Sequence, residues 1–90
     1  MIEKRVTVLN SEGLHTRPAN QFVKLVKGFE SEVEIEKEGR GAPGKSLLKI
    51  MKLGVVQGDE ITVRCDGPDE ESAMASIEEL LKGEAAEVER

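Results

Sequence analysis

The sequence predicts an α/β (α+β) fold in which a single antiparallel sheet carries helices on one face. Some segments alternate between apolar and polar residues, which is typical of strands with one buried side. Other segments repeat apolar residues every three or four positions, as helices with one buried face do. The segments follow one another in the order strand, helix, strand, strand, helix, strand, helix, with short connections. So few strands and such short connections favour one sheet that is covered on one side.

The first half of the chain is expected to hold two strands and a helix. Residues 2–9 alternate and are rich in β-branched side chains, so we expect a strand there. The segment 16–27 is expected to be a helix that ends at Gly28. Its apolar residues recur at the spacing of one helix face: Ala19, Phe22, Val23 and Val26. Residues 32–36 predict a second strand with an acidic solvent face, and residues 39–44 predict a loop or hairpin with room for a short third strand.

The second half continues with a short helix, a strand and a longer helix. Ser46 is a good N-cap for a helix over residues 47–53. Residues 60–65 alternate and predict a strand, in which Cys65 has the parity of the core side. The last helix is expected to begin at Pro68 or Asp69. Its buried face is expected to consist of Ala73, Ile77, Leu80 and Leu81, and it is expected to end at Gly83.

Length, charge and cysteine content narrow the class of protein. The 90 residues suffice for one domain, which we place at residues 1–83, followed by an acidic tail at 84–90 that we expect to fray. The net charge of −5 argues against binding to nucleic acid, whose phosphates require a basic surface. One histidine and one cysteine are too few for a disulfide or a structural zinc site, so we expect no metal and no cofactor. No signal peptide or long apolar run is evident, which predicts a cytoplasmic protein without membrane insertion.

The segment around the only histidine is the strongest candidate for a functional site. His15 immediately precedes the helix predicted at 16–27, and Pro18 suits the first turn of that helix. The N-terminus of a helix carries a partial positive charge and favours phosphate, and the planar guanidinium of Arg17 can bind phosphate oxygens in pairs. His15 and Arg17 therefore predict a site for a phosphorylated imidazole. A solvated surface histidine or a simple helix cap is the alternative that the residues leave open.

A second segment matches a nucleotide-binding pattern. Residues 39–46 fit the P-loop sequence G-x-x-x-x-G-K-[ST] and lie between a predicted strand and a predicted helix. A P-loop also requires a parallel sheet and a separate acidic ligand for magnesium, and this chain is short for both. The alternative is that the glycines form a turn and that Ser46 caps the next helix. Ser46 could then also accept a regulatory phosphate at that helix N-terminus.

The short helix at 47–53 is too apolar to be buried on all its sides. Leu47, Leu48 and Met51 share it with two further apolar residues, so at least one of the five is expected to be exposed. Three lysines surround them without any acid: Lys45, Lys49 and Lys52. An exposed apolar group with a basic rim predicts a docking surface for an acidic protein partner.

These segments together resemble one family. The run Gly13-Leu14-His15-Thr16-Arg17-Pro18-Ala19, the helix start Lys45-Ser46-Leu47-Leu48 and the run Met51-Lys52-Leu53-Gly54 are similar to HPr, the histidine-containing phosphocarrier of the bacterial sugar phosphotransferase system. The likeness covers about residues 2–81 in the same element order. It implies an open-faced β-sandwich, with a four-stranded antiparallel sheet and three helices on one side in the order βαββαβα.

The resemblance also implies a function and partners. The chain would accept phosphate from enzyme I at Nδ1 of His15, with support from Arg17, and pass it to IIA domains of sugar permeases. It would be a relay and not an autonomous enzyme. Ser46 would be the target of an HPr kinase/phosphorylase, and the docking surface would include Thr16, Asn20, Leu47, Leu48 and Met51. The alternative within the same fold is a regulatory module for nitrogen or carbon control that acts by stoichiometric protein binding.

Overall fold

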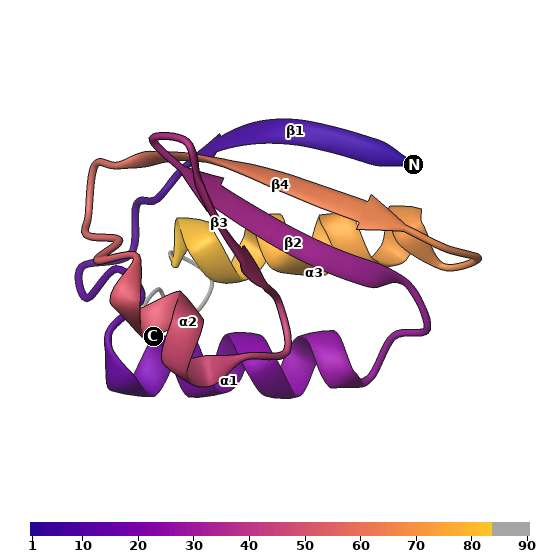
Figure 1. The fold of residues 1–90 in the computed structure, drawn as a ribbon, viewed down its shortest axis with the longest axis horizontal. Helices are drawn as coiled ribbons and strands as arrows, with labels where there is room; N and C mark the ends of the chain where they lie inside the picture. Colours follow the sequence, from indigo (N-terminus) through magenta and orange to yellow (C-terminus); the bar gives the residue numbers. More distant parts are fainter. Residues whose placement is uncertain (84–90) are drawn as a thin grey trace.

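The computed structural model describes residues 1–83, and it shows one antiparallel sheet with all helices on one face (Figure 1). The strand order in the sheet is β1-β4-β2-β3. In chain order the elements are β1 (Ile2–Thr7), α1 (Thr16–Lys27), β2 (Glu32–Lys37), β3 (Arg40–Pro43), α2 (Leu47–Lys52), β4 (Glu60–Asp66) and α3 (Glu70–Lys82). The predicted fold class and element order are therefore confirmed. The tail predicted at 84–90 lies outside the described residues, and within residues 1–83 no helix is long and apolar enough to span a membrane.

The third strand, for which the sequence left room, is formed by β3. Its four residues pair with β2 from Lys37 opposite Arg40 to Glu34 opposite Pro43. The two strands are joined by Glu38 and Gly39, both with positive φ (54° and 83°), which is the backbone of a tight hairpin turn. Residues 39–44 are therefore a hairpin and not an open loop.

The first strand is shorter than predicted, because β1 ends at Thr7 and not at residue 9. Beyond Thr7 the backbone bonds to other partners. The N–H of Val8 donates to the carbonyl of Asp59 at 2.8 Å, and those of Leu9 and Asn10 donate to the carbonyl of Leu81 at 2.9 and 3.1 Å. These bonds satisfy a carbonyl in the last turn of α3, where no intrahelical partner exists. The chain thereby leaves the sheet and crosses to the start of α1.

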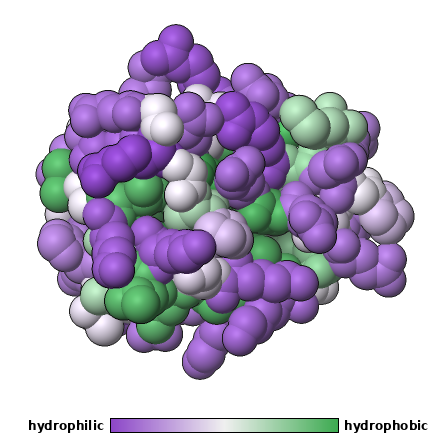
Figure 2. Space-filling model, viewed as in Figure 1, coloured by the Kyte–Doolittle hydropathy of each residue, from purple (hydrophilic) through white to green (hydrophobic). Residues whose placement is uncertain are grey.

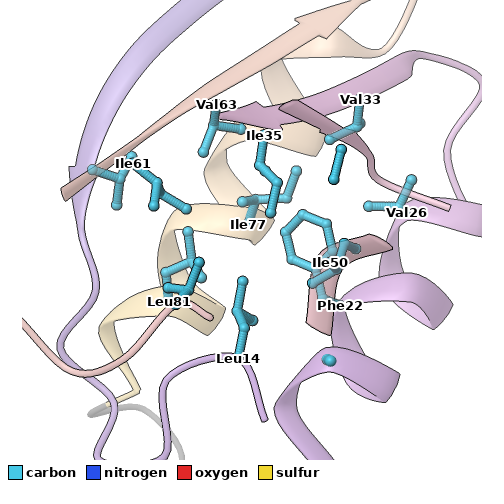
Figure 3. Packing of buried hydrophobic residues seen from close by; sticks show 14 of the residues in the cluster. Leu14, Phe22, Val26, Val33, Ile35, Ile50, Ile61, Val63, Ile77 and Leu81 are labelled. Carbon is cyan, nitrogen blue, oxygen red and sulfur yellow. The ribbon is translucent and has the colours of Figure 1, made fainter. Parts of the chain in front are cut away.

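The core lies between the sheet and the three helices, and Figure 3 shows it in close-up. The predicted inner face of α1 is buried. Cys65 is buried as well, and its burial raises the pKa of its thiol. In α3 the buried face includes Met74, which the spacing did not single out, whereas Leu80 is only partly buried. The largest fully buried side chains include Phe22, Ile35, Ile50, Ile61, Met74, Ile77 and Leu81. Aliphatic packing therefore holds the sheet and helices together.

The outer face of the sheet is polar, as the alternating strands predicted. Arg64 of β4 lies at its centre and binds Glu3 of β1 at 2.8 Å, and Glu36 and Glu34 of β2 at 2.8 and 3.5 Å. The bonds to Glu36 and Glu3 hold the pKa of the guanidinium above its usual value. Ion pairs at the surface each contribute only about 0–1 kcal/mol. The network thus orders the outer face, while the buried face supplies most of the stability.

The connection from α1 to β2 is fixed by the carboxylate of Asp69, the N-cap residue of α3. It accepts hydrogen bonds from the backbone N–H groups of Glu30 and Ser31, both at 2.9 Å, and from the Ser31 hydroxyl. Ser31 is the one polar residue buried in the described chain. The bond from the Ser31 hydroxyl, followed by that from Glu30, lowers the pKa of Asp69.

Because of the Asp69 carboxylate, we expect the free energy of unfolding to depend on pH in the acidic range. Because the pKa of Asp69 is lower in the folded state than the unfolded value of about 3.9, its contribution is complete above that value and is lost as the pH falls through the folded pKa. Asp69→Asn should lower the free energy of unfolding at neutral pH. The variant should also show a smaller loss of stability than the parent between about pH 4 and pH 2, as measured by urea unfolding at each pH. Asp66→Asn is the control, since Asp66 is exposed and within residues 1–83 its carboxylate pairs with the amino terminus alone, at 3.8 Å. Equal pH dependence in the parent and Asp69→Asn would contradict the assignment.

Candidate functional site

His15 occupies the N-cap position of α1, as the sequence predicted. Its backbone is extended (φ −76°, ψ −164°), and its carbonyl accepts the first helical hydrogen bond, from Ala19 at 2.8 Å. The side chain is exposed and makes no capping hydrogen bond. The imidazole is therefore accessible to a partner and is not used to close the helix.

The first turn of α1 presents N–H groups beside this histidine. Thr16 and Arg17 are the first two helical residues, whose N–H groups have no acceptor inside a helix, and Pro18 has no N–H. No acidic side chain lies in this turn, while Lys24 and Lys27 lie in the last turn. The positive end of the helix thus has no counter-charge within its own first turn, which favours a bound anion.

The turn that leads to His15 is held by hydrogen bonds to its backbone. Gly13 has φ +61°, and the side-chain amide of Asn10 donates to its carbonyl at 2.7 Å. The N–H of Leu14 donates to the carbonyl of Val55 at 3.0 Å, and the Leu14 side chain is buried as part of the core (Figure 3). His15 therefore follows directly after an anchored residue. Sequence reasoning missed Asn10 and Val55, because a backbone carbonyl and a turn asparagine leave no chemical signature.

Arg17 lies on the wall of an open depression of about 280 Å³ between the start of α1 and the end of α3. The other residues lining it are Asn10, Ser11, Glu12, Pro18, Gln21, Leu80 and Gly83. Arg17 is exposed and forms no salt bridge within residues 1–83. Its guanidinium is thus available to an anion in the vicinity of the helix start. His15 is not among the residues that line this depression, so the joint action of Arg17 and His15 on one phosphate stays a prediction.

Ser46 caps α2, as predicted. Its hydroxyl accepts a hydrogen bond from the N–H of Lys49 at 3.3 Å, and its carbonyl accepts one from Ile50 at 3.0 Å. The N–H of Ser46 donates to Pro43 at the end of β3 at 3.1 Å. These bonds connect the hairpin to the helix through Ser46, whose side chain is only partly exposed.

The apolar residues of α2 divide between core and surface. Ile50 is buried, Leu47 is partly buried, and Leu48 and Met51 are exposed by 65% and 38%. Figure 2 shows an apolar area over α2 among hydrophilic side chains. Helix α2 contacts α1 and lies in front of its N-terminal half (Figure 1). The expected exposure of part of this helix is therefore confirmed, and the exposed group lies on the same side of the fold as the start of α1.

The other predicted docking residues lie on α1. Thr16 and Asn20 are both exposed, one turn apart on this helix. The lysines of the basic segment are exposed as well, at positions 45, 49 and 52. The surface formed by Thr16, Asn20, Leu47, Leu48 and Met51 is hereafter called the α1–α2 surface.

The P-loop interpretation of residues 39–46 is wrong. Arg40 to Pro43 form β3, and Gly41 pairs with Glu36 across the hairpin. A phosphate-binding loop needs its N–H groups free to converge on the phosphate, whereas here the segment is paired in a sheet. A carboxylate oxygen of Glu34 also lies beside Gly41, 2.9 Å from where a Cβ would stand, and it would repel phosphate. Within residues 1–83 no group of three histidine, cysteine or acidic side chains could hold a metal ion.

Comparisons with known proteins agree on one family. A family model described as "PTS HPr component phosphorylation site" matches residues 2–83. The phosphocarrier protein HPr of Haemophilus influenzae is 43% identical over 81 residues, which cover 90% of this chain and 95% of that protein. The crystal structure of HPr-C-His from Thermoanaerobacter tengcongensis superposes with a TM-score of 0.90 at 36% identity, covering 97% of this chain and 98% of that one. The solution structure of Crh, described as the Bacillus subtilis catabolite repression HPr, gives a TM-score of 0.68 at 33% identity and covers 90% and 96% of the two chains.

Proposed function

The chain belongs to the HPr family of phosphocarrier proteins of the phosphotransferase system, and on this premise we propose that it accepts a phosphoryl group from enzyme I on His15 and passes it to IIA domains of sugar permeases. The observation that supports this most is the exposed imidazole at the N-cap of α1. The exchange takes place in the cytoplasm in this proposal. The buried, unpaired Cys65 fits a reducing compartment.

The geometry suits reversible transfer. A ring nitrogen of His15, Nδ1 in this proposal, attacks the phosphorus atom; the new N–P bond forms while the bond between phosphorus and the donor breaks. In this proposal the added negative charge is stabilised by the N–H groups of Thr16 and Arg17 at the start of α1, and by the Arg17 guanidinium when its side chain turns toward the phosphate. The reverse exchange with the acceptor protein breaks the same N–P bond. An open site with one guanidinium and the end of one helix stabilises the phosphoryl group moderately in this proposal, so the group can leave again.

The α1–α2 surface is the proposed docking surface for both partners. Its exposed Leu48 and Met51 can be buried by an apolar patch, and the surrounding lysines favour an acidic rim on the partner. Because the surface includes Thr16, a partner bound there reaches the imidazole of the preceding residue. One docking surface beside one nucleophile lets donor and acceptor proteins alternate.

The direct test is phosphorylation followed by transport. Incubated with phosphoenolpyruvate and enzyme I, the protein should acquire an acid-labile phosphate, and it should support sugar uptake when combined with a permease. A regulatory module that acts only by stoichiometric binding would support no uptake. Absence of the acid-labile phosphate under conditions in which a known HPr is labelled would reject the carrier function.

Ser46 is proposed as a regulatory phosphorylation site for an HPr kinase/phosphorylase. Its position at the start of α2, beside Lys49 and next to Leu47, means that a phosphate would add about two negative charges to the α1–α2 surface. An acid-stable phosphate should form with the kinase and ATP, and Ser46→Ala should abolish it. The mimic Ser46→Asp should slow phosphorylation of His15 about tenfold, because like charge opposes an acidic partner. Ser72→Asp, on α3, is the matched control and should leave the rate unchanged. Equal rates for the two aspartate variants would remove this role.

A further inference from the structure

The loop between α2 and β4, residues 54–59, supports the segment that ends at His15. The Val55 carbonyl accepts the Leu14 N–H at 3.0 Å. Gly13 lies so close to this loop that a Cβ there would overlap the Val55 carbonyl oxygen and would stand 2.7 Å from the Cα of Val56. Leu14 and Val55 are both buried, with 2% and 1% of their surface exposed. The backbone before His15 is therefore stacked on Val55 and Val56 without intervening side chains.

One lysine and one aspartate hold the ends of this loop. The Lys37 ammonium, at the end of β2, donates to the Gly54 carbonyl at 2.8 Å and pairs with the Asp59 carboxylate at 2.8 Å. The same carboxylate oxygen, Oδ2, accepts the N–H of Val56 at 2.9 Å. The bond from Lys37, followed by that from Val56, lowers the pKa of Asp59. The two side chains are exposed by only 15% and 26%, so this pair is better shielded than a typical surface pair.

Backbone bonds also hold the loop: the N–H of Gly54 donates to the carbonyl of Met51 at 3.2 Å, and that of Asp59 donates to the carbonyl of Val56 at 3.0 Å. The N–H of Gly58 donates to Val8 at 2.7 Å, and Val8 donates to Asp59 at 2.8 Å. The part that contacts Gly13 lies between Gly54 and Val56, where the loop is held by Lys37 and by the Asp59 carboxylate. The ion pair thus adds the side-chain bonds that hold the loop segment in contact with Gly13 and Leu14.

We propose that Lys37 and Asp59 are positioning residues for phosphoryl transfer at His15, acting through the 54–59 loop. The inference rests on the proposed function. The two residues would affect the reaction without contacting the phosphate themselves. Transfer requires the imidazole at attacking distance and angle inside the partner's site, and a misplacement of about 1 Å can cost about a hundredfold in rate. A loop that releases Val55 and Val56 would let Gly13 and Leu14 shift, and the imidazole with them.

The test compares two lysine variants in the enzyme I reaction, with the protein as the varied substrate. Lys37→Met removes the ammonium that holds the loop. Lys4→Met is the matched control, because Lys4 also pairs with a carboxylate, Glu78 at 3.4 Å, between β1 and α3. At a temperature at which melting curves show every variant folded, Lys37→Met should lower kcat about tenfold with KM within about twofold. Lys4→Met should match the parent, and Lys37→Arg should recover at least half of the lost rate.

The variant Asp59→Asn keeps the test valid if Lys37→Met does not fold, and it should show the same fall in kcat. In ¹⁵N–¹H spectra, the amides of Leu14 and His15 should shift in the Lys37 variant and stay in place in Lys4→Met. A parental kcat for both loop variants, an effect confined to KM, or an unchanged His15 amide would overturn the positioning role. Labelling of the parent by phosphoenolpyruvate and enzyme I is measured first. If the parent is not labelled, the carrier function fails; if it is labelled and the variants match it, only this inference fails.

Discussion

Replacing His15 with alanine is expected to abolish the acid-labile phosphate that this protein should acquire in the proposed reaction with enzyme I and phosphoenolpyruvate. His15 is the only histidine of the chain, so no other imidazole can take over the N–P bond. The fold should persist, because the side chain is exposed and makes no capping hydrogen bond. We therefore expect a loss of at least about a thousandfold in labelling rate, as for removal of a nucleophile, with a melting temperature close to that of the parent. The measurement is incorporation of ³²P, read before and after acid treatment.

Arg17→Met gives the contrast to this prediction. It removes the cation that we propose to stabilise the phosphoryl group but leaves the nucleophile, so labelling should slow without vanishing. A His15→Ala protein that is folded and labelled at the parental rate would show that another residue accepts the phosphate. A loss in Arg17→Met as complete as in His15→Ala would show that the guanidinium does more than stabilise charge.

The local pattern of apolar and turn residues was sufficient to predict most of the fold. The inner face of α1 follows from apolar spacing alone, and the end of α3 follows from Gly83, which has φ +74° and closes the helix. The pattern was insufficient where tertiary partners decide. The strand β1 does not extend to residue 9 because the N–H groups of Leu9 and Asn10 bond to a carbonyl in the last turn of α3, a partner more than 70 residues away. The residues of β3 have poor strand propensity and are held by pairing with β2.

The candidate site divides in the same way. The position of His15 at a helix start is encoded within a few residues by Gly13, Pro18 and the apolar spacing that follows. The residues that hold this segment in place could not be predicted from the sequence around it. In the sequence, Lys37 lies just after the strand predicted at 32–36 and Asp59 is only a turn residue, and their pairing depends on how β2 and β4 are placed. The P-loop match failed for a related reason, since a glycine-rich pattern does not specify whether the segment is paired in a sheet.

Gly13→Ala is expected to lower the free energy of unfolding by about 2–4 kcal/mol. Two effects combine. The backbone has φ +61°, which costs an alanine about 1 kcal/mol. The new methyl group would also overlap the backbone of Val55 and Val56, and forced overpacking of this kind costs about 1–3 kcal/mol. In a domain of this size, thermal unfolding should show a fall in melting temperature of about 10 °C or more.

Gly39→Ala separates the two effects. Gly39 has φ +83°, but a Cβ there would meet nothing within 4 Å, so only the backbone cost of about 1 kcal/mol should appear. The difference between the two variants then measures the contact of the Gly13 turn with the 54–59 loop. If that contact also positions the imidazole, Gly13→Ala should transfer phosphate more slowly than the parent at temperatures at which it is folded, whereas Gly39→Ala should not. Equal destabilisation by both substitutions would mean that the loop yields freely to the turn, and a loop that yields could not hold His15 in place.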